Sequence, residues 1–406
     1  HFLNKYTRHI FTGLEGRATG TVRVFGPFRQ VNIEGDMRVD EAATHVNVLN
    51  VDYHLAGDSV ILRPDNIWIR DARMYDKLGR PGMDEHCAVM NVHLMHQNLK
   101  HLRYDVQAEA RNVLGYDFRD FGDMPFYGTI FATGDVKLSG RPGEMTADIN
   151  GTPMPGSVLV YNSTSPETLT EAGFITYASP QPATQRPAET HIDTAATQEG
   201  EGTASDMRLN FNLNVNPDAT LRVLMDARSG DYINLHGRGH ILASYYNKGR
   251  FSMYGTYHVE DGIYKLSLQD VIRKDFQFQS GGTITFGGNA QQASLNLKAT
   301  YTVPNVSMDD LSATTLGLSN TRVDCVMNIG GRPLAPVVTF DFDLPSANED
   351  EKNMVRQMIN TEEERNMQVI YLLGIGRFYN QSMQYVSAAD QSKTAMNSLL
   401  SSTLSN

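Results

Sequence analysis

The sequence contains little cysteine, little tryptophan and no excess of positive charge. Its 406 residues include two Cys and one Trp, so a disulfide framework is excluded. Lys and Arg number 35 against 46 Asp and Glu, which gives a net charge of −11. A nucleic-acid partner would require a basic stripe to replace phosphate counterions. The charge balance therefore argues against that class of partner.

Long hydrophobic runs are also absent. Mean hydropathy is −0.36, and no stretch approaches the roughly 20 apolar residues that a membrane-spanning helix needs. The chain has no initiator Met and no charged-then-apolar leader, so we expect it to be a fragment of a longer protein. A hydrophobic content of 40% is enough for a sizeable core and excludes full disorder.

Residues suited to catalysis or metal binding do not form a convincing group. Four histidines lie close together in the sequence: His86, His93, His96 and His101. The spacing of His93 and His96 places them on opposite faces of a strand, which disfavours a shared metal. Acidic runs at residues 309–310 and 362–364 are typical of turns and helix starts. We expect no metal site, no cofactor and no enzymatic activity.

Strict alternation of apolar and polar residues is the strongest pattern in the chain. Five apolar residues alternate with Arg and Asn: Met207, Leu209, Phe211, Leu213 and Val215. Successive side chains of a strand point to opposite faces, so this segment predicts a strand with one apolar face. Similar runs follow, and they include Ile284 and Phe286, Leu295 and Leu297, and Val338, Phe340 and Phe342.

Turn-forming residues separate these runs at short intervals. Residues 260–262, 280–282 and 287–289 are rich in Gly, Asn and Asp, which predicts hairpin turns. No helical crossovers intervene, so an antiparallel sheet is favoured over a parallel one. A Gly- and Pro-containing corner recurs near residues 22–35, 136–143 and 326–333. Turn chemistry alone explains such corners, but true repeats would favour an elongated stack.

Composition divides the chain into four parts. Residues 1–178 are a β-rich segment, 179–204 a polar excursion rich in Pro, Thr and Gln, 205–345 a second β domain, and 346–406 a helical tail. In the tail, acidic residues 349–351 predict one helix start. A capping box from Thr361 to Glu364 predicts a second helix, which the glycines near residue 376 would end. We expect a third helix at about 382–404.

Between residues 230 and 378, four runs and part of the tail have a distinctive order and spacing: residues 237–241, 251–264, 276–288, 293–301 and 373–378. Through these runs, residues 230–378 resemble the C-terminal domain of the TamB family, which belongs with the AsmA-like proteins among bridge-like lipid-transfer proteins. The tail is similar to the family's Leu-Leu-aromatic-Gly-Arg signature. Gly374 stands where Leu is usual, which resembles the Bacteroidetes-type branch.

The resemblance implies a mainly β fold, with long antiparallel strands curled into an elongated trough, the β-taco, and a short helical segment. It also implies a periplasmic protein anchored in the inner membrane that carries phospholipid and docks to a TamA-like outer-membrane barrel. The groove candidates are Met207, Leu209, Phe211, Leu213, Val215, Ile284, Phe286, Leu295, Leu297, Val338, Phe340 and Phe342. The docking candidates are Leu372, Leu373, Gly376, Arg377 and Phe378.

Other interpretations of the alternating pattern remain open. Such runs are common in the packed core of an ordinary sandwich. Exposed strand edges could instead help a barrel partner to insert outer-membrane proteins. A membrane β-barrel also alternates, but the helical tail and the polar excursion argue against it. A solenoid enzyme acting on carbohydrate would need a clustered acidic site, which the sequence does not show.

Overall fold

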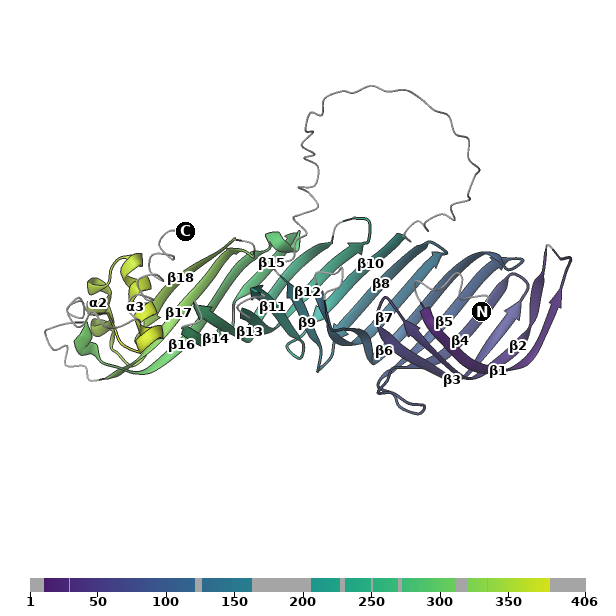
Figure 1. Cartoon of the computed structure of the whole chain (residues 1–406), viewed down its shortest axis with the longest axis horizontal. Coiled ribbons are helices and arrows are strands. Elements are labelled where there is room, and N and C mark those ends of the chain that lie inside the picture. The colour runs from purple at the N-terminus through teal and green to yellow at the C-terminus, as the bar shows by residue number, and fades with distance from the viewer. Residues whose placement is uncertain are drawn as a thin grey trace, which may run out of the picture.

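Over the residues that the structure describes, the fold is an elongated, curled β-sheet of 18 strands with two short helices at its C-terminal end (Figure 1). The computed structural model describes residues 11–28, 30–120, 126–162, 206–226, 231–249, 251–268, 272–311, 320–333 and 335–379. The predicted class, mainly β with a curled sheet of long antiparallel strands, is confirmed. The third helix expected at 382–404 and the polar excursion at 179–204 lie outside the described residues.

The strands fall into two series. The first comprises β1 (Phe11–Phe25), β2 (Asn32–Val46), β3 (Val51–Arg63), β4 (Asn66–Tyr75), β5 (Cys87–Gln97), β6 (Lys100–Phe118), β7 (Phe126–Arg141), β8 (Glu144–Pro153) and β9 (Val158–Asn162). The second comprises β10 (Asp206–Val215), β11 (Thr220–Asp226), β12 (Asp231–Tyr246), β13 (Ser252–Leu268), β14 (Ile272–Phe278), β15 (Thr283–Gly288), β16 (Ser294–Val306), β17 (Thr321–Arg332) and β18 (Ala335–Asp343).

Neighbouring strands within each series are antiparallel, whereas the two series join through parallel pairs. β8 pairs in parallel with β10, and β9 pairs in parallel with β11. The segments before and after residues 163–205 therefore belong to one continuous sheet. Hydrogen bonding crosses the junction without a break in pairing. The division of the chain into domains at residues 179–204 remains a prediction.

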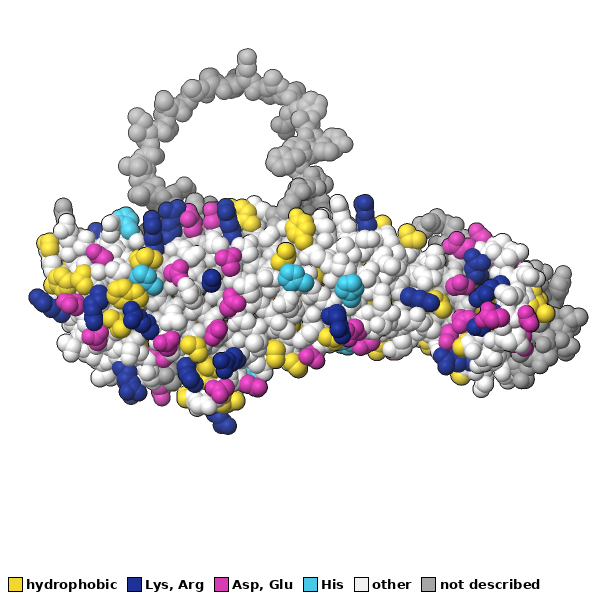
Figure 2. Space-filling view, turned by 180° about the vertical axis from the view of Figure 1, so that it is seen from behind, with side chains coloured by type: hydrophobic (Ala, Val, Ile, Leu, Met, Phe, Trp, Pro, Cys, Tyr) yellow, Lys and Arg dark blue, Asp and Glu magenta, His cyan; other side chains and the backbone are white. Residues whose placement is uncertain are grey.

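One face of this sheet, which we call the inner face, carries the alternating apolar side chains. Register keeps them aligned from strand to strand: Ile149 pairs with Phe211, and Phe211 pairs with Ala243. The opposite, outer face carries the charged and amide side chains of the same strands. Figure 2 shows Lys, Arg, Asp, Glu and His side chains spread along the molecule, with hydrophobic side chains scattered among them.

A bulge keeps the inner face apolar along the longest strand of the second series. The turn predicted at residues 260–262 is wrong, because these residues lie inside the continuous strand β13. Asp261 pairs with His236 and Val259 with Gly237, so Glu260 is an extra residue in the ladder. The insertion lets Val259 and Gly262 both face inward. By contrast, residues 280–282 form the predicted turn between β14 and β15, and Asn289 caps the 3-10 helix η2 (Ala290–Gln292).

The first series curls until the β2–β3 turn meets β6. Asn50 donates a hydrogen bond from Nδ2 to the carbonyl oxygen of Asp117 at 2.5 Å, and the Tyr53 hydroxyl donates to the carbonyl of Leu114 at 2.7 Å. β4 and β5 lie between β3 and β6 in the sheet, so these bonds require strong curvature. Val46, Val51 and several inner-face neighbours pack in the closed corner.

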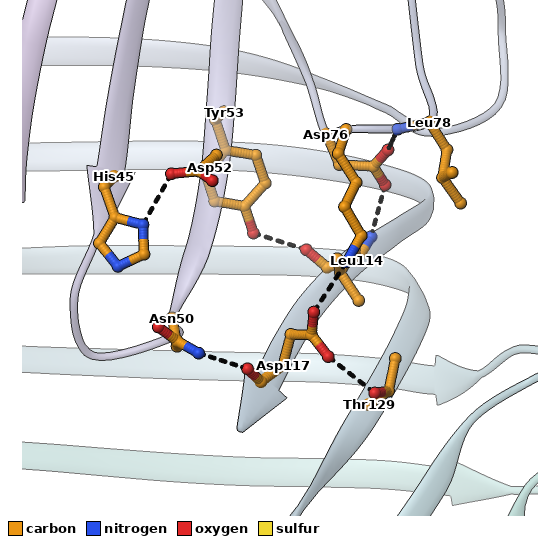
Figure 3. A network of polar contacts seen from close by, with 10 residues as sticks. His45, Asn50, Asp52, Tyr53, Asp76, Leu78, Leu114, Asp117 and Thr129 are labelled. Atoms are coloured by element: carbon orange, nitrogen blue, oxygen red, sulfur yellow. Dashed lines mark hydrogen bonds and ion pairs between the residues drawn. The ribbon is translucent and has the colours of Figure 1, made fainter. Parts of the chain in front are cut away.

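A buried carboxylate fastens the loop after β4 beside this corner (Figure 3). Asp76 is fully buried and accepts hydrogen bonds from the backbone N–H groups of Leu78 at 2.8 Å and Leu114 at 2.7 Å. Lys77 binds the Asp117 carboxylate at 2.8 Å, and Thr129 donates to that carboxylate at 2.7 Å. These bonds compensate for the cost of removing the charged groups from water and join β4, β6 and β7.

Two helices cover the inner face at the C-terminal end. α2 (Glu349–Met358) and α3 (Glu362–Ile375) both begin with a capping box, the second at Thr361 and Glu364 as predicted. Gly376 ends α3 with φ of 72°, a conformation that glycine adopts without a Cβ clash. Helix residues such as Val355 and Val369 join Phe276 and Met327 of the sheet in one buried cluster. We call this the C-terminal cluster.

Candidate functional site

The predicted groove residues lie on one face of one sheet. The five in β10 are all half-buried, while Arg208, Asn210 and Asn214 between them are exposed on the other face. Pairing places Ile284 opposite Leu295, and the cross-strand alternation continues through β17 to Phe340 and Phe342. Their role in binding lipid remains a prediction, but their placement on a common face follows from the register.

These predicted groove residues differ in how much of each side chain is exposed to solvent. Ile284 and Leu297 are buried within the C-terminal cluster. Phe286, Leu295, Phe340, Phe342, Leu213 and Val215 are partly buried and pack against that cluster. Val338 is 41% exposed. Met207, Leu209 and Phe211 lie beyond the cluster, so the accessible part of the predicted groove is centred on β10.

Much of the accessible inner face comes from the first series, which the sequence interpretation did not assign to the groove. Half-buried residues on this face include Met37, Val39, Val60, Ile67, Ile69, Val92, Leu94, Val106, Val136, Leu138 and Ile149. A signal was present in the sequence, because Leu102, Tyr104 and Val106 of β6 alternate with charged or amide residues. The inner-face side chains of β5, β6, β7, β8 and β10 that the structure describes are uncharged.

The predicted docking residues serve packing in this chain. Leu372 and Leu373 are each 1% exposed, and Phe378 is fully buried with its ring edge-on to Phe342 at 5.5 Å. Arg377 binds both carboxylate oxygens of Asp310 at 2.9 and 3.0 Å. Docking through this segment remains a prediction, and direct contact by the buried side chains would require α3 to leave the sheet.

Asp58 lies where the pairing between β3 and β4 is interrupted. Its carboxylate accepts the backbone N–H of Arg73 at 3.3 Å, in place of a backbone acceptor. The second carboxylate oxygen is buried and has no hydrogen-bond partner in the described part of the chain. Burial raises the pKa of Asp58, partly offset by the Arg73 hydrogen bond. The side chain therefore favours its neutral form more than an exposed Asp does.

Asp58→Asn is expected to flatten the pH dependence of stability. A carboxyl whose pKa is raised by folding stabilises the fold fully below the unfolded-state pKa, about 3.9, and loses that contribution as pH rises through the folded-state pKa. The amide cannot ionise, so the variant should lose less stability than the parent between pH 4 and pH 7. Urea unfolding at several pH values measures this, and equal slopes for both proteins would contradict it.

The outer face at the parallel junction carries a ladder of amides. Asn210 donates to Asp148 at 2.8 Å, Asn212 donates to Asn150 at 3.0 Å, and His240 contacts the Asn212 oxygen at 2.5 Å. A shallow recess lies over these side chains, directly behind Phe211. Amide pairs of this kind stabilise neighbouring strands, and they hold β8 and β10 in the register that aligns the inner face.

A protein-family model matches most of the chain. The TamB C-terminal domain matches residues 76–406, which is most of the chain and begins well upstream of residue 230. The chain belongs to the TamB family. TamB proteins are a non-enzymatic transport and assembly family of the cell envelope, membrane-associated, with TamA-like partners. The family is involved in outer-membrane protein assembly or lipid transport. No curated protein matches this TamB-family chain.

The described residues offer neither a metal site nor a membrane-spanning helix. No group of three or more His, Cys, Asp and Glu side chains there is arranged to hold a metal ion. Among the helices of the same residues, none combines the length and apolarity needed to cross a bilayer. The apolar inner face is thus the main candidate site that the described residues of this TamB-family chain offer.

Proposed function

We propose that the chain carries phospholipid along its inner face between the inner and outer membranes. The observation that supports this most strongly is the uncharged, half-buried inner face of β5 to β8 and β10. Nine consecutive strands from β1 to β8 and on to β10 give a path of roughly 40 Å at about 4.8 Å per strand. This exceeds the roughly 15 Å hydrocarbon depth of one bilayer leaflet. An apolar surface of this extent is stable in water when a ligand covers it.

In this proposal the two ends of the sheet would face different membranes. The C-terminal end, where α3 packs against β18, would face a TamA-like outer-membrane barrel. The β1 end would face the inner membrane, to which the full-length protein would be anchored in the periplasm. Because the sheet is continuous through the parallel junction, acyl chains could pass from one series to the other without crossing a polar barrier.

Mass spectrometry of the purified chain after organic extraction tests the proposal. We expect phospholipid to be enriched over a control protein of similar size purified from the same cells. Lipid on the control at the same level, or none on the chain, would contradict a role as a conduit. Detergent should be omitted throughout, since it would compete for the apolar face.

Assistance with the insertion of outer-membrane proteins is a second candidate function. β18 pairs with β17 on one side, and the backbone N–H of Phe340 donates to Asn366 of α3. A partner strand could add at this edge if α3 moved. Blocking the inner face separates the two functions. Loss of lipid transfer with normal outer-membrane protein assembly would favour the conduit, and the reverse would favour the assembly role.

A further inference from the structure

One charged side chain stands out on the inner face of the second series. Pairing of Leu266 with Lys274 and of Tyr264 with Phe276 places Lys274 on the same face as Phe276 and Phe278. Both phenylalanines are buried in the C-terminal cluster. Among the inner-face side chains that the structure describes from β10 to β18, Lys274 alone is charged. It therefore interrupts a surface that is otherwise uncharged.

Lys274 contacts a tyrosine and has no carboxylate partner within the described residues. Its Nζ donates a hydrogen bond to the Tyr301 hydroxyl at 3.2 Å and lies 5.0 Å from the centre of that ring. Tyr301 in turn packs against Phe276, with ring centres 5.9 Å apart. Lys265 offers a contrast, because its side chain points to the outer face and binds Asp275 at 3.3 Å.

An ammonium on an apolar face is tolerated here because the side chain is only half-buried and its charged end can reach solvent. Acyl chains covering the inner face would displace that water, and the cost of the uncompensated charge would then rise. An anion delivered with the acyl chains would remove this cost. The phosphate of a phospholipid provides one, joined to the chains that exclude the water.

We infer that Lys274 and Tyr301 bind the phosphate group of a phospholipid whose acyl chains lie on the inner face. Lys274 supplies the positive charge, and the Tyr301 hydroxyl, which accepts a bond from Lys274, is free to donate its own proton to a phosphate oxygen. The inference rests on the proposed function and deepens it, since it gives the path a preference for lipids that carry phosphate. It also places a headgroup beside α3, which contacts β14.

The test compares the whole 406-residue chain with Lys274→Met and, as a matched control, Lys265→Met. The probes are palmitoyl lysophosphatidylglycerol, neutral monopalmitoylglycerol with the same acyl chain, palmitate and inorganic phosphate. Each is titrated below its critical micelle concentration by fluorescence competition. The parent should bind the phosphate lipid about tenfold more tightly than the neutral one, as expected for one hydrogen bond to a charged group.

Lys274→Met should abolish that preference, because it weakens binding of the phosphate lipid and removes the uncompensated charge that opposes binding of monopalmitoylglycerol. Lys265→Met should behave as the parent, and Lys274→Arg should restore most of the preference. A preference that survives in Lys274→Met would overturn the inference and leave the conduit standing. Palmitate bound as tightly as the phosphate lipid would overturn the selectivity for phosphate. Tight binding of inorganic phosphate alone would identify free phosphate, and not lipid, as the ligand.

Failure of the lipid conduit and failure of the phosphate site give different results. If none of the acyl probes binds to the parent chain, both the conduit and the phosphate site fail. If both acyl lipids bind equally to all variants, only the phosphate site fails. Unfolding midpoints of the variants should match that of the parent, because the substituted side chains are half-exposed. A Lys274→Met protein that did not fold would shift the decision to Tyr301→Phe, which should weaken phosphate-lipid binding several-fold.

Discussion

Phe211→Arg is expected to reduce the phospholipid that co-purifies with the chain at least tenfold. Phe211 lies on the inner face in the middle of β10, between Ile149 and Ala243 in the paired strands. A guanidinium there would have to be buried by acyl chains without a partner, which costs several kcal/mol, enough for the expected loss. Because the position is half-exposed in the free chain, the long side chain can reach water and the fold should persist.

Asn214→Arg is the matched control for this substitution. Asn214 belongs to the same strand but is exposed on the outer face. It should retain the lipid content of the parent, as measured by mass spectrometry after organic extraction. Circular dichroism should show the same strand content for both variants. Equal lipid content in Phe211→Arg and Asn214→Arg would show that the inner face of β10 is not the path.

Phe378→Ala is expected to lower the free energy of unfolding by about 3–5 kcal/mol, the usual cost of truncating a buried Phe. The ring is fully buried in the C-terminal cluster and lies edge-on to Phe342. Its removal leaves a cavity where the segment after α3 meets β18. Chemical denaturation followed by tryptophan fluorescence and by circular dichroism measures the loss.

Ile375→Ala provides the comparison from the same segment. Ile375 is 50% exposed, so its truncation should change stability by no more than about 0.5 kcal/mol. If Phe378→Ala were equally harmless, the segment would not be part of the core. Deleting residues 372–378 would not isolate docking, because the deletion also removes the three core side chains Leu372, Leu373 and Phe378.

Strand identity and facing could be predicted where alternation is strict. The run from Met207 to Val215 specifies both a strand and its apolar face, because the side-chain period of a strand is two residues. The capping box at Thr361 likewise specifies a helix start through local hydrogen bonds. In both cases the information lies within about ten residues of sequence.

Long-range pairing decided the features that the sequence did not reveal. Glu260 and Asp261 have turn composition, but the partner strand β12 holds them in a bulge. The parallel pairing of β8 with β10 joins segments separated by residues 154–205, so no local pattern could indicate it. Burial of Leu372 and Phe378 depends on how α3 packs against the sheet, and the family signature carries no information about that packing.

The extent of the apolar inner face also depends on the first series. The family resemblance read from the sequence begins at residue 230, yet β6 and β7 continue the face on which Phe211 lies. Val106 pairs with Leu138, and Gln107 beside it pairs with Lys137 on the outer face. The side chains of these adjacent residues therefore point to opposite faces of the sheet.

Site-specific photo-crosslinking in living cells tests the central claim most directly. A photoreactive amino acid placed at Val106, Val136 or Phe211 should form adducts with phospholipid, detected as a mass shift of the purified chain. The same amino acid at Gln107 or Lys137 should form none. Adducts of equal yield on both faces, or adducts absent from all three inner positions, would contradict a continuous lipid path along the inner face.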